Sequence, residues 1–266
     1  MARTIIMGAG IAGHTAALHL RRMLPKQHEV VVIAPNSKWN WIPSNIWVGV
    51  GQMSTKQVTF PLAPIYARKG IEFHQALAVE LHGEGSPDLP RPHITVQYTD
   101  PARNGQTARL EYDYLINATG PKLNFGATPG LGPDGNSWSV CTAGHAEQTA
   151  AALAEAITKL KAGQQQTFLI GMGHGTCTCQ GAAFEYTFNV EDQLAKEGVR
   201  DRAEVIYITN EAHLGDFGMD GMNFGTKAGV VPSQMFTESL FQERGVKAIL
   251  GAHIESVEPG VAHYEQ

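Results

Sequence analysis

The sequence has few cysteines, no excess of positive charge and no long apolar run. It has three cysteines in 266 residues. A small, odd number of cysteines is not typical of a disulfide-stabilised secreted domain. The formal net charge of −5 excludes the basic surface by which proteins bind nucleic acid. A bilayer span requires about 20 consecutive apolar residues, and none is present. The first residues also lack the basic and apolar segments of a secretory signal. We therefore expect a soluble globular chain with no nucleic-acid partner.

A glycine-rich turn lies close to the start of the chain. Residues 3–7 have the composition of a buried strand, residues 8–13 read GAGIAG, and residues 14–24 have the composition of a helix. A second buried strand is expected at residues 29–34 (EVVVIA). This order of strand, glycine turn, helix and strand predicts a dinucleotide-binding unit.

Each glycine of the turn has a separate role in binding a dinucleotide. Gly8 allows the tight turn, Gly10 lets the backbone approach a pyrophosphate, and Gly13 allows the helix to pack closely on the strand. The phosphates then bind the free N–H groups at the helix N-terminus.

One expected part of this unit is missing. An acid at the end of the second strand normally binds a ribose 2′-hydroxyl, but no Asp or Glu occurs between Val30 and Ile71. We expect Asn36 or Ser37 to hydrogen-bond the ribose instead. Lys38 is either a weak sign of a 2′-phosphate, as in NADP, or an ordinary solvated lysine.

A second motif indicates that the dinucleotide is FAD. Residues 112–118 (YDYLINA) are expected to form a strand that leads into Ala118, Thr119 and Gly120. An Asp before an apolar strand that ends in Ala-Thr-Gly resembles the second FAD motif of flavoproteins with two dinucleotide-binding domains. The order of the two motifs favours FAD over NADP.

A similar unit follows later in the chain. Helices are expected at residues 143–161 and 182–197, and strands at residues 167–170 and 204–209. A second glycine-rich turn, GMGHG at residues 171–175, lies between the first of these strands and the second helix.

The repeated pattern predicts an α/β fold with tandem Rossmann-like domains. We expect residues 1–138 to form the first part of an FAD-binding domain, with a linker at residues 121–138. Residues 139–266 are expected to form the second domain, which carries the cysteines. The C-terminal part of such an architecture is expected to be missing from this sequence.

The second turn is a poor pyrophosphate site and carries thiols. Thr176 stands where the third glycine is expected, and Cys177 and Cys179 follow it. A thiol there would lie close to where a nicotinamide meets a flavin, so we expect the electron donor to act through sulfur. Zinc is the alternative for this pair, but it needs four convergent ligands and only His174 is near. We therefore expect no metal.

Cys141 and His145 lie four residues apart where the helix at residues 143–161 begins, so they can share one face. A thiolate is the nucleophile, and a helix N-terminus or a cation favours it; alternatively, Cys141 is a small buried apolar residue. His145 is either a general acid and base or an ordinary first-turn residue. Glu185 is either a solvated helix residue or a proton acceptor near sulfur.

Five segments of the sequence resemble sulfide:quinone oxidoreductases. The cysteine-containing segments are more specific than the glycine turn, and the resemblance covers essentially the whole chain. Flavocytochrome sulfide dehydrogenases share the architecture. The five segments are PSNIWVG (43–49), GPKLNFG (120–126), SVCTAGHA (139–146), CQGAAFEY (179–186) and HLGDFG (213–218).

The resemblance implies an FAD cofactor and three active cysteines. Cys141 and Cys179 match the first and second of these, Cys177 is extra, and the third belongs to a C-terminal region that this sequence lacks. That region also carries the quinone pocket and the membrane-binding helices, so the sequence is expected to be about the N-terminal two-thirds of such an enzyme. Related enzymes often have His where this chain has Asp216, and a proton relay at that position is therefore not implied.

The implied reaction oxidises sulfide to zero-valent sulfur or polysulfide. Sulfide attacks a disulfide or polysulfide that involves Cys179, Cys141 assists sulfur transfer, and FAD passes two electrons to a quinone. The intact enzyme is then a peripheral membrane protein, with a homo-oligomer as an open alternative. Three other functions also stay open: a flavocytochrome sulfide dehydrogenase, a type II NADH:quinone reductase, and an inactive FAD-binding remnant.

Overall fold

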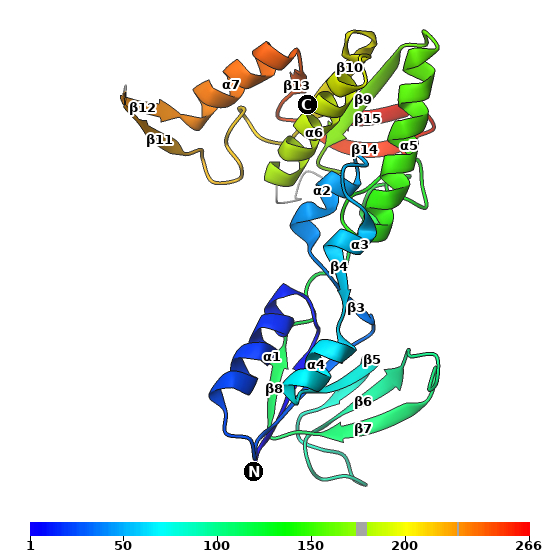
Figure 1. Cartoon of the computed structure of the whole chain (residues 1–266), viewed down its shortest axis with the longest axis vertical. Helices are drawn as coiled ribbons and strands as arrows, with labels where there is room; N and C mark the ends of the chain where they lie inside the picture. Colours follow the sequence, from blue (N-terminus) through cyan, green and yellow to red (C-terminus); the bar gives the residue numbers. More distant parts are fainter. Residues whose placement is uncertain (174–179, 228) are drawn as a thin grey trace. The chain divides into compact units, whose positions relative to one another are not determined.

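The computed structural model describes residues 1–173, 180–227 and 229–266. The chain forms two compact units, each built around its own sheet (Figure 1). The fold is α/β, as the repeated strand–turn–helix pattern predicts. Unit 1 consists of Met1–Trp41 and Thr59–Lys122, and unit 2 consists of Ile42–Val58 and Leu123–Gln266.

Unit 1 contains a six-stranded sheet in the order β7-β6-β5-β2-β1-β8. The strands β5, β2, β1 and β8 are parallel to one another. Strand β5 also pairs with β6, and β6 pairs with β7, in an antiparallel meander. A short hairpin of β3 and β4 accompanies the sheet. The elements are β1 (Arg3–Met7), α1 (Ile11–Met23), β2 (Glu29–Ala34), β3 (Lys38–Asn40), β4 (Thr59–Pro61), α4 (Ala63–Lys69), β5 (Glu72–His82), β6 (His93–Tyr98), β7 (Thr107–Glu111) and β8 (Tyr114–Asn117).

The central strands of unit 1 are apolar throughout because both of their faces are covered. Ile5 and Val31 point into a core that includes the meander strands β6 and β7. Their neighbours Ile6 and Val32 point into a second core, which includes residues of α1 and α4. This double burial explains the uninterrupted apolar runs of β1 and β2, which period-two patterning alone would not produce.

Unit 2 contains a three-stranded parallel sheet in the order β13-β10-β9. Helix α6 connects β9 to β10, and α7 precedes β13, as in one half of a Rossmann fold. Two hairpins, β11–β12 and β14–β15, complete the unit. The elements are η1 (Ile42–Ser44), α2 (Asn45–Val48), α3 (Thr55–Val58), η2 (Phe125–Ala127), α5 (Ala143–Lys161), β9 (Gln166–Gly171), α6 (Gln180–Lys196), η3 (Arg200–Arg202), β10 (Ala203–Ile208), β11 (Asn223–Thr226), β12 (Gly229–Pro232), α7 (Ser233–Arg244), β13 (Lys247–Ile249), β14 (His253–Glu258) and β15 (Val261–Glu265).

Most predicted elements are present, with small shifts at their ends. The helix at Ala143–Lys161 has the predicted bounds. Helix α1 begins at Ile11 instead of His14, because the chain becomes helical directly after Gly10 and includes Gly13 in its first turn. The assignment of residues 1–138 to FAD binding and of residues 139–266 to the redox cysteines stays a prediction.

From Leu123 onward, the predicted linker is an ordered part of unit 2. The backbone N–H of Val257, in β14, donates to the carbonyl of Pro129 over 2.9 Å. The side-chain amide of Asn136 donates to the carbonyl of Val257, also over 2.9 Å. These bonds attach the segment to the β14–β15 hairpin.

The segment Ile42–Val58 packs in unit 2, although it lies between two stretches of unit 1 in the sequence. The hydroxyl of Tyr186, in α6, donates to the carbonyl of Gly49 over 3.1 Å. A Cβ atom on Gly49 would lie 2.8 Å from Cγ1 of Val140 and 3.0 Å from the Tyr186 ring. Only glycine therefore fits at this position without moving its neighbours.

We expect Gly49→Val to lower the free energy of unfolding by about 1–3 kcal/mol, the usual cost of overpacking. Gly144→Ala is the control, because a Cβ there meets no atom within 4 Å and the residue lies in α5. Replacing this helical glycine should raise the free energy of unfolding by roughly 0.5–1 kcal/mol. Urea denaturation measures both effects. Wild-type stability of Gly49→Val would show that the packing at Gly49 is loose.

Candidate functional site

The first glycine turn lies where the strand order of unit 1 changes direction. Strand β1 pairs in parallel with β2 on one side and with β8 on the other. The chain thus passes from β1 to β2 through α1, and returns much later to the opposite side of β1. The carboxyl ends of β1 and β8 therefore form a topological switch point, where α/β sheets bind their ligands.

Two glycines of the turn are required by packing within the protein. Gly8 has a φ of +100°, and a Cβ atom on it would lie 2.1 Å from the carbonyl oxygen of Ala118. A Cβ on Gly13 would lie 2.0 Å from the carbonyl oxygen of Gly8. The two contacts bring strand β1, helix α1 and the end of β8 together at backbone distance.

Gly10 differs from both. It is exposed, and a Cβ on it would meet no atom within 4 Å. Gly10 is also the N-cap of the 13-residue helix α1, with no side-chain cap and no acid in the first turn. The first N–H groups of α1 are thus available to an anion, and the open space lies where a pyrophosphate approaches such a turn. The residues present fit the pyrophosphate of a dinucleotide.

The structure brings the Ala-Thr-Gly motif to this turn. The N–H of Ala118 donates to the carbonyl of Met7 over 2.8 Å, which extends the pairing of β8 with β1. Thr119 bonds to the side-chain oxygen of Asn117 through its N–H and its hydroxyl, over 3.2 and 2.9 Å. Thr119 and Gly120 are exposed at the same end of the sheet as Gly10.

Asn36 and Ser37 follow β2 directly, at the same edge of the sheet, and both are exposed. Ser37 accepts a hydrogen bond from the N–H of Leu62 through its backbone carbonyl, which leaves its hydroxyl out of that contact. Trp39 lies next to this pair and stacks on Phe60 at a centroid distance of 4.8 Å. The two side chains expected to contact the ribose are therefore accessible and uncharged.

His14 and Tyr66 form a pair beside the turn that the sequence analysis does not predict. Nδ1 of His14 lies 3.0 Å from the Tyr66 hydroxyl. Burial lowers the pKa of His14 and raises the pKa of Tyr66 to about 12. Both groups are therefore uncharged at neutral pH. The only sequence signal is a histidine directly after the third glycine.

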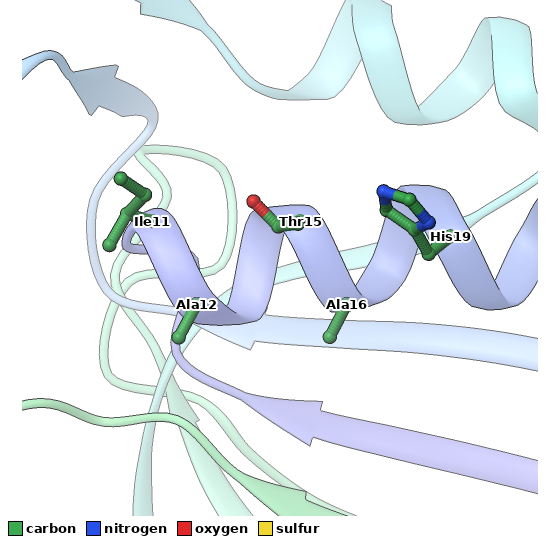
Figure 2. Close-up of a pocket in the computed structure, with 5 residues that line it drawn as sticks. All are labelled: Ile11, Ala12, Thr15, Ala16 and His19. Atoms are coloured by element: carbon green, nitrogen blue, oxygen red, sulfur yellow. The ribbon is translucent and has the colours of Figure 1, made fainter.

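Figure 2 shows the residues that line an open pocket on the exposed side of α1, namely Ile11, Ala12, Thr15, Ala16 and His19. The volume of this pocket is about 530 Å³. Thr15 and His19 supply its only polar side-chain groups. The pocket includes none of the glycines and none of the residues that follow β8. Ile11 and Ala12 belong to both the turn and the pocket, so this mainly apolar face of α1 begins at the dinucleotide turn.

Cys141 is exposed in a turn of unit 2. Hydrogen bonds fix the residues on both sides of it. Its N–H donates to the hydroxyl of Ser139 over 3.1 Å. The hydroxyl of Thr149 donates to the carbonyl of Ser139 over 2.7 Å. Thr142 is the N-cap of α5 and accepts from the N–H of His145 over 3.1 Å. The thiol is thereby presented outside the first turn of α5.

His145 is half-buried, with its ring 5.8 Å from the ring of Phe125. Its Nδ1 atom is buried and has no hydrogen-bond partner among the described residues. Glu185 is exposed on α6. Cys177 and Cys179 lie outside the described residues. The roles of these residues stay predictions.

Asp216 has a structural role in the loop after β10. Its side chain accepts hydrogen bonds from the N–H groups of Met219 and Asp220, each over 3.1 Å. Asp220 and Phe217 have positive φ angles of 59° and 54°. Asp216 thus stabilises a tight loop, which explains why a polar residue other than histidine is accommodated there.

The described part of the chain contains no group of three His, Cys, Asp or Glu side chains placed to bind a metal ion. Among the helices of residues 1–173, 180–227 and 229–266, none is both long and apolar enough to cross a membrane.

The different surroundings of Gly8 and Gly10 give a matched test. We expect Gly10→Val to abolish FAD binding with little change in stability, because the new side chain fills only the open space beside the turn. Gly8→Val should lower the free energy of unfolding by more than about 1 kcal/mol, because it combines a positive φ with a clash against Ala118. Flavin fluorescence titration and thermal unfolding separate the two effects. Undiminished FAD affinity in Gly10→Val would contradict the assigned phosphate position.

Comparison with known proteins identifies relatives over the full chain. No family model matches. The chain is 30% identical over 261 residues to a sulfide-quinone reductase of Aquifex aeolicus (strain VF5), covering 98% of this chain and 53% of the relative. A crystal structure of the sulfide:quinone oxidoreductase from Aquifex aeolicus matches with a TM-score of 0.80 and 28% identity, over 100% of this chain and 56% of the other.

A second solved structure supports the fold alone. The NDH2 structure from Plasmodium falciparum in complex with NADH matches with a TM-score of 0.71 and 18% identity, over 99% of this chain and 51% of that protein. The chain spans about half the length of the relatives it matches, which is less than the two-thirds expected from the sequence. The chain is thus similar to sulfide:quinone oxidoreductases over about half of their length, and it has a tandem Rossmann-like fold.

Proposed function

We propose that the chain is the FAD-binding and thiol-bearing part of an oxidoreductase that oxidises sulfide. The observation that carries this proposal is the meeting of two motifs at the switch point of unit 1. The Gly8–Gly13 turn and the Ala118–Gly120 segment are far apart in sequence, yet Gly8 and Ala118 are in backbone contact. The 30% identity to a protein named sulfide-quinone reductase supports the substrate.

In this proposal the residues around the first turn bind FAD. The N–H groups after Gly10 bind the pyrophosphate, and Gly8 and Gly13 maintain the turn that presents them. Asn36 and Ser37 hydrogen-bond the ribose, since no acid is available after β2. Ala118, Thr119 and Gly120 contact the cofactor from the adjacent strand. Bound FAD supplies a two-electron acceptor.

The thiols of unit 2 form and release the sulfur product. Hydrosulfide attacks one sulfur of a disulfide that includes Cys179, so that a new S–S bond forms and the second cysteine leaves as a thiolate. In the persulfide so formed, the sulfur gained from hydrosulfide is at the zero-valent level, because the disulfide has accepted its two electrons. Bound FAD would accept two electrons from the thiolate and the persulfide, which would restore a link between the two cysteines with the gained sulfur held in it. Cys141 or Cys177 is the partner cysteine, and a further thiol–disulfide exchange releases the sulfur chain.

Two ionisable residues handle protons in this scheme. The exposed Cys141 lies at the start of α5, and His145 lies in the first turn of the same helix. Because Nδ1 of His145 has no partner among the described residues, it can accept or return the proton of hydrosulfide. Glu185, on α6, is the second proton acceptor, and it lies close to Cys179 in the sequence.

For the intact protein, we extend the proposal to the electron acceptor and the location. A quinone receives the two electrons, and the intact protein acts as a peripheral enzyme at a membrane surface. The quinone site and the membrane contacts would lie in the portion of the relatives that this chain does not match. A homo-oligomer is compatible with this arrangement.

The test is an anaerobic sulfide titration of the FAD-reconstituted chain, followed by flavin absorbance. We expect sulfide to bleach the flavin, and we expect Cys179→Ser to reduce the bleaching rate to that of free FAD. Cys141→Ser and Cys177→Ser then identify the partner cysteine, because only the variant that lacks this partner should lose the reaction. The intact protein should also reduce quinone in a sulfide-dependent manner.

Other outcomes identify the alternatives. Full bleaching by Cys179→Ser would overturn the thiol mechanism. A flavin spectrum that sulfide cannot bleach would indicate an FAD-binding remnant, whereas bleaching by NADH and not by sulfide would indicate an NADH:quinone reductase. Co-purification with a c-type haem protein would indicate a flavocytochrome sulfide dehydrogenase.

A further inference from the structure

Helix α1, which begins at the first glycine turn, carries a histidine that contacts three other elements of unit 1. The N–H of His14 donates to the carbonyl of Gly10 over 2.9 Å, so His14 lies one helical turn after the N-cap. Between ring centroids, its ring lies 5.8 Å from Trp39 in β3, 5.7 Å from Phe60 in β4 and 5.5 Å from Tyr66 in α4. A single side chain thus connects the start of α1 with the β3–β4 hairpin and with α4.

The contact between His14 and Tyr66 is a buried hydrogen bond. Nδ1 of His14 lies 3.0 Å from the Tyr66 hydroxyl, and Tyr66 has no exposed surface. Burial lowers the pKa of His14 and raises the pKa of Tyr66, so both groups stay uncharged at neutral pH. Removing either group would leave the other without this partner away from water, which costs more than the loss of an exposed hydrogen bond. The pair therefore holds α1 and α4 in one arrangement.

The loop that carries Asn36 and Ser37 is held by the same elements. The carbonyl of Ser37 accepts from the N–H of Leu62 over 3.0 Å. Leu62 is the N-cap of α4, and its carbonyl accepts from the N–H of Tyr66 over 3.1 Å. Strand β3 begins directly after Ser37 and carries Trp39. The place of the loop relative to α1 therefore depends on β3 and α4, which the ring contacts and the buried hydrogen bond join to α1.

We propose that His14, through its hydrogen bond to Tyr66, is a positioning residue that fixes Asn36 and Ser37 relative to the N-terminus of α1. This inference rests on the proposed FAD site, in which the helix binds the pyrophosphate and the loop binds the ribose. A dinucleotide contacts both at once, so a fixed spacing lowers the cost of ordering the two partners on binding. Neither side chain of the pair has to touch the cofactor.

The chain offers a matched pair on the other face of the same sheet. Nδ1 of His74 lies 2.8 Å from the hydroxyl of Tyr98, and both residues are buried. His74 is aligned with Ile33, which points into the core that includes β6 and β7 and not into the core that includes residues of α1 and α4. Tyr98→Phe thus deletes the same hydroxyl from the same kind of pair, on the face that α1 and α4 do not cover.

The experiment is a fluorescence titration of FAD with the full chain and its variants, with thermal unfolding to show that each variant is folded. We expect Tyr66→Phe to weaken FAD binding by at least about threefold. His14→Phe keeps a ring but has no Nδ1 acceptor, so it should reproduce this loss, and the double variant should add little to it. Tyr98→Phe should lower the stability to a similar extent and leave the dissociation constant of FAD unchanged.

A second background tests whether the pair acts through the loop. In the chain with Asn36→Ala and Ser37→Ala together, the ribose contacts are gone, so Tyr66→Phe should cause no further loss of FAD affinity. A loss that persists in this background would overturn the inference. Equal losses in Tyr66→Phe and Tyr98→Phe would also overturn it, and so would undiminished affinity in folded Tyr66→Phe.

Failure of the proposed function gives a different result from failure of this inference. A wild type that does not bind FAD would overturn the proposed function and the inference with it. If the chain with Asn36→Ala and Ser37→Ala binds FAD as tightly as the wild type, the proposed ribose contacts are wrong, and the positioning role falls with them.

Discussion

The backbone contact between Gly8 and Ala118 determines the geometry of unit 1. Strands β1 and β8 end side by side, and the turn that leaves β1 passes so close to the end of β8 that a Cβ atom would overlap a carbonyl oxygen. Helix α1 then returns across the same turn, with Gly13 in equal proximity to Gly8. Because Gly8 and Gly13 have no side chains, the backbones of the turn, of α1 and of the end of β8 can lie in contact in one small volume. The N–H groups of the helix are directed outward from that volume.

The same constraint explains why the first site could be predicted from sequence. Glycines at fixed spacing, flanked by apolar strands, leave few alternative structures. The residues of the Ala-Thr-Gly motif reach the turn because β8 is parallel to β1, and parallel strands end at the same edge of a sheet. The uninterrupted apolar runs of β1 and β2 likewise predict that both faces of these strands are buried. In the structure, alternate residues of the two strands point into two different cores.

Other features depend on contacts between distant residues, which local patterns do not encode. Residues 121–138 have the glycine and proline content of a linker, but they form hydrogen bonds with β14 and with Gly173. The carboxylate of Asp216 caps two N–H groups of its loop, and only the structure reveals this role. The pairing of His14 with Tyr66 likewise joins residues 52 positions apart. Cys177 and Cys179 lie outside the described residues, and their roles rest on the sequence.

The insertion of Ile42–Val58 into unit 2 has a consequence for synthesis of the chain. The apolar residues of this segment find their partners on α5 and α6, and the Gly49–Tyr186 bond spans 137 residues. At a translation rate of about 5–20 residues per second, the segment waits roughly 7 to 27 s before Tyr186 has been added. During that interval, Met1–Trp41 and Thr59–Lys122 can assemble around an uncovered apolar loop. The apolar residues of this segment therefore stay without their packing partners until α6 has been synthesised.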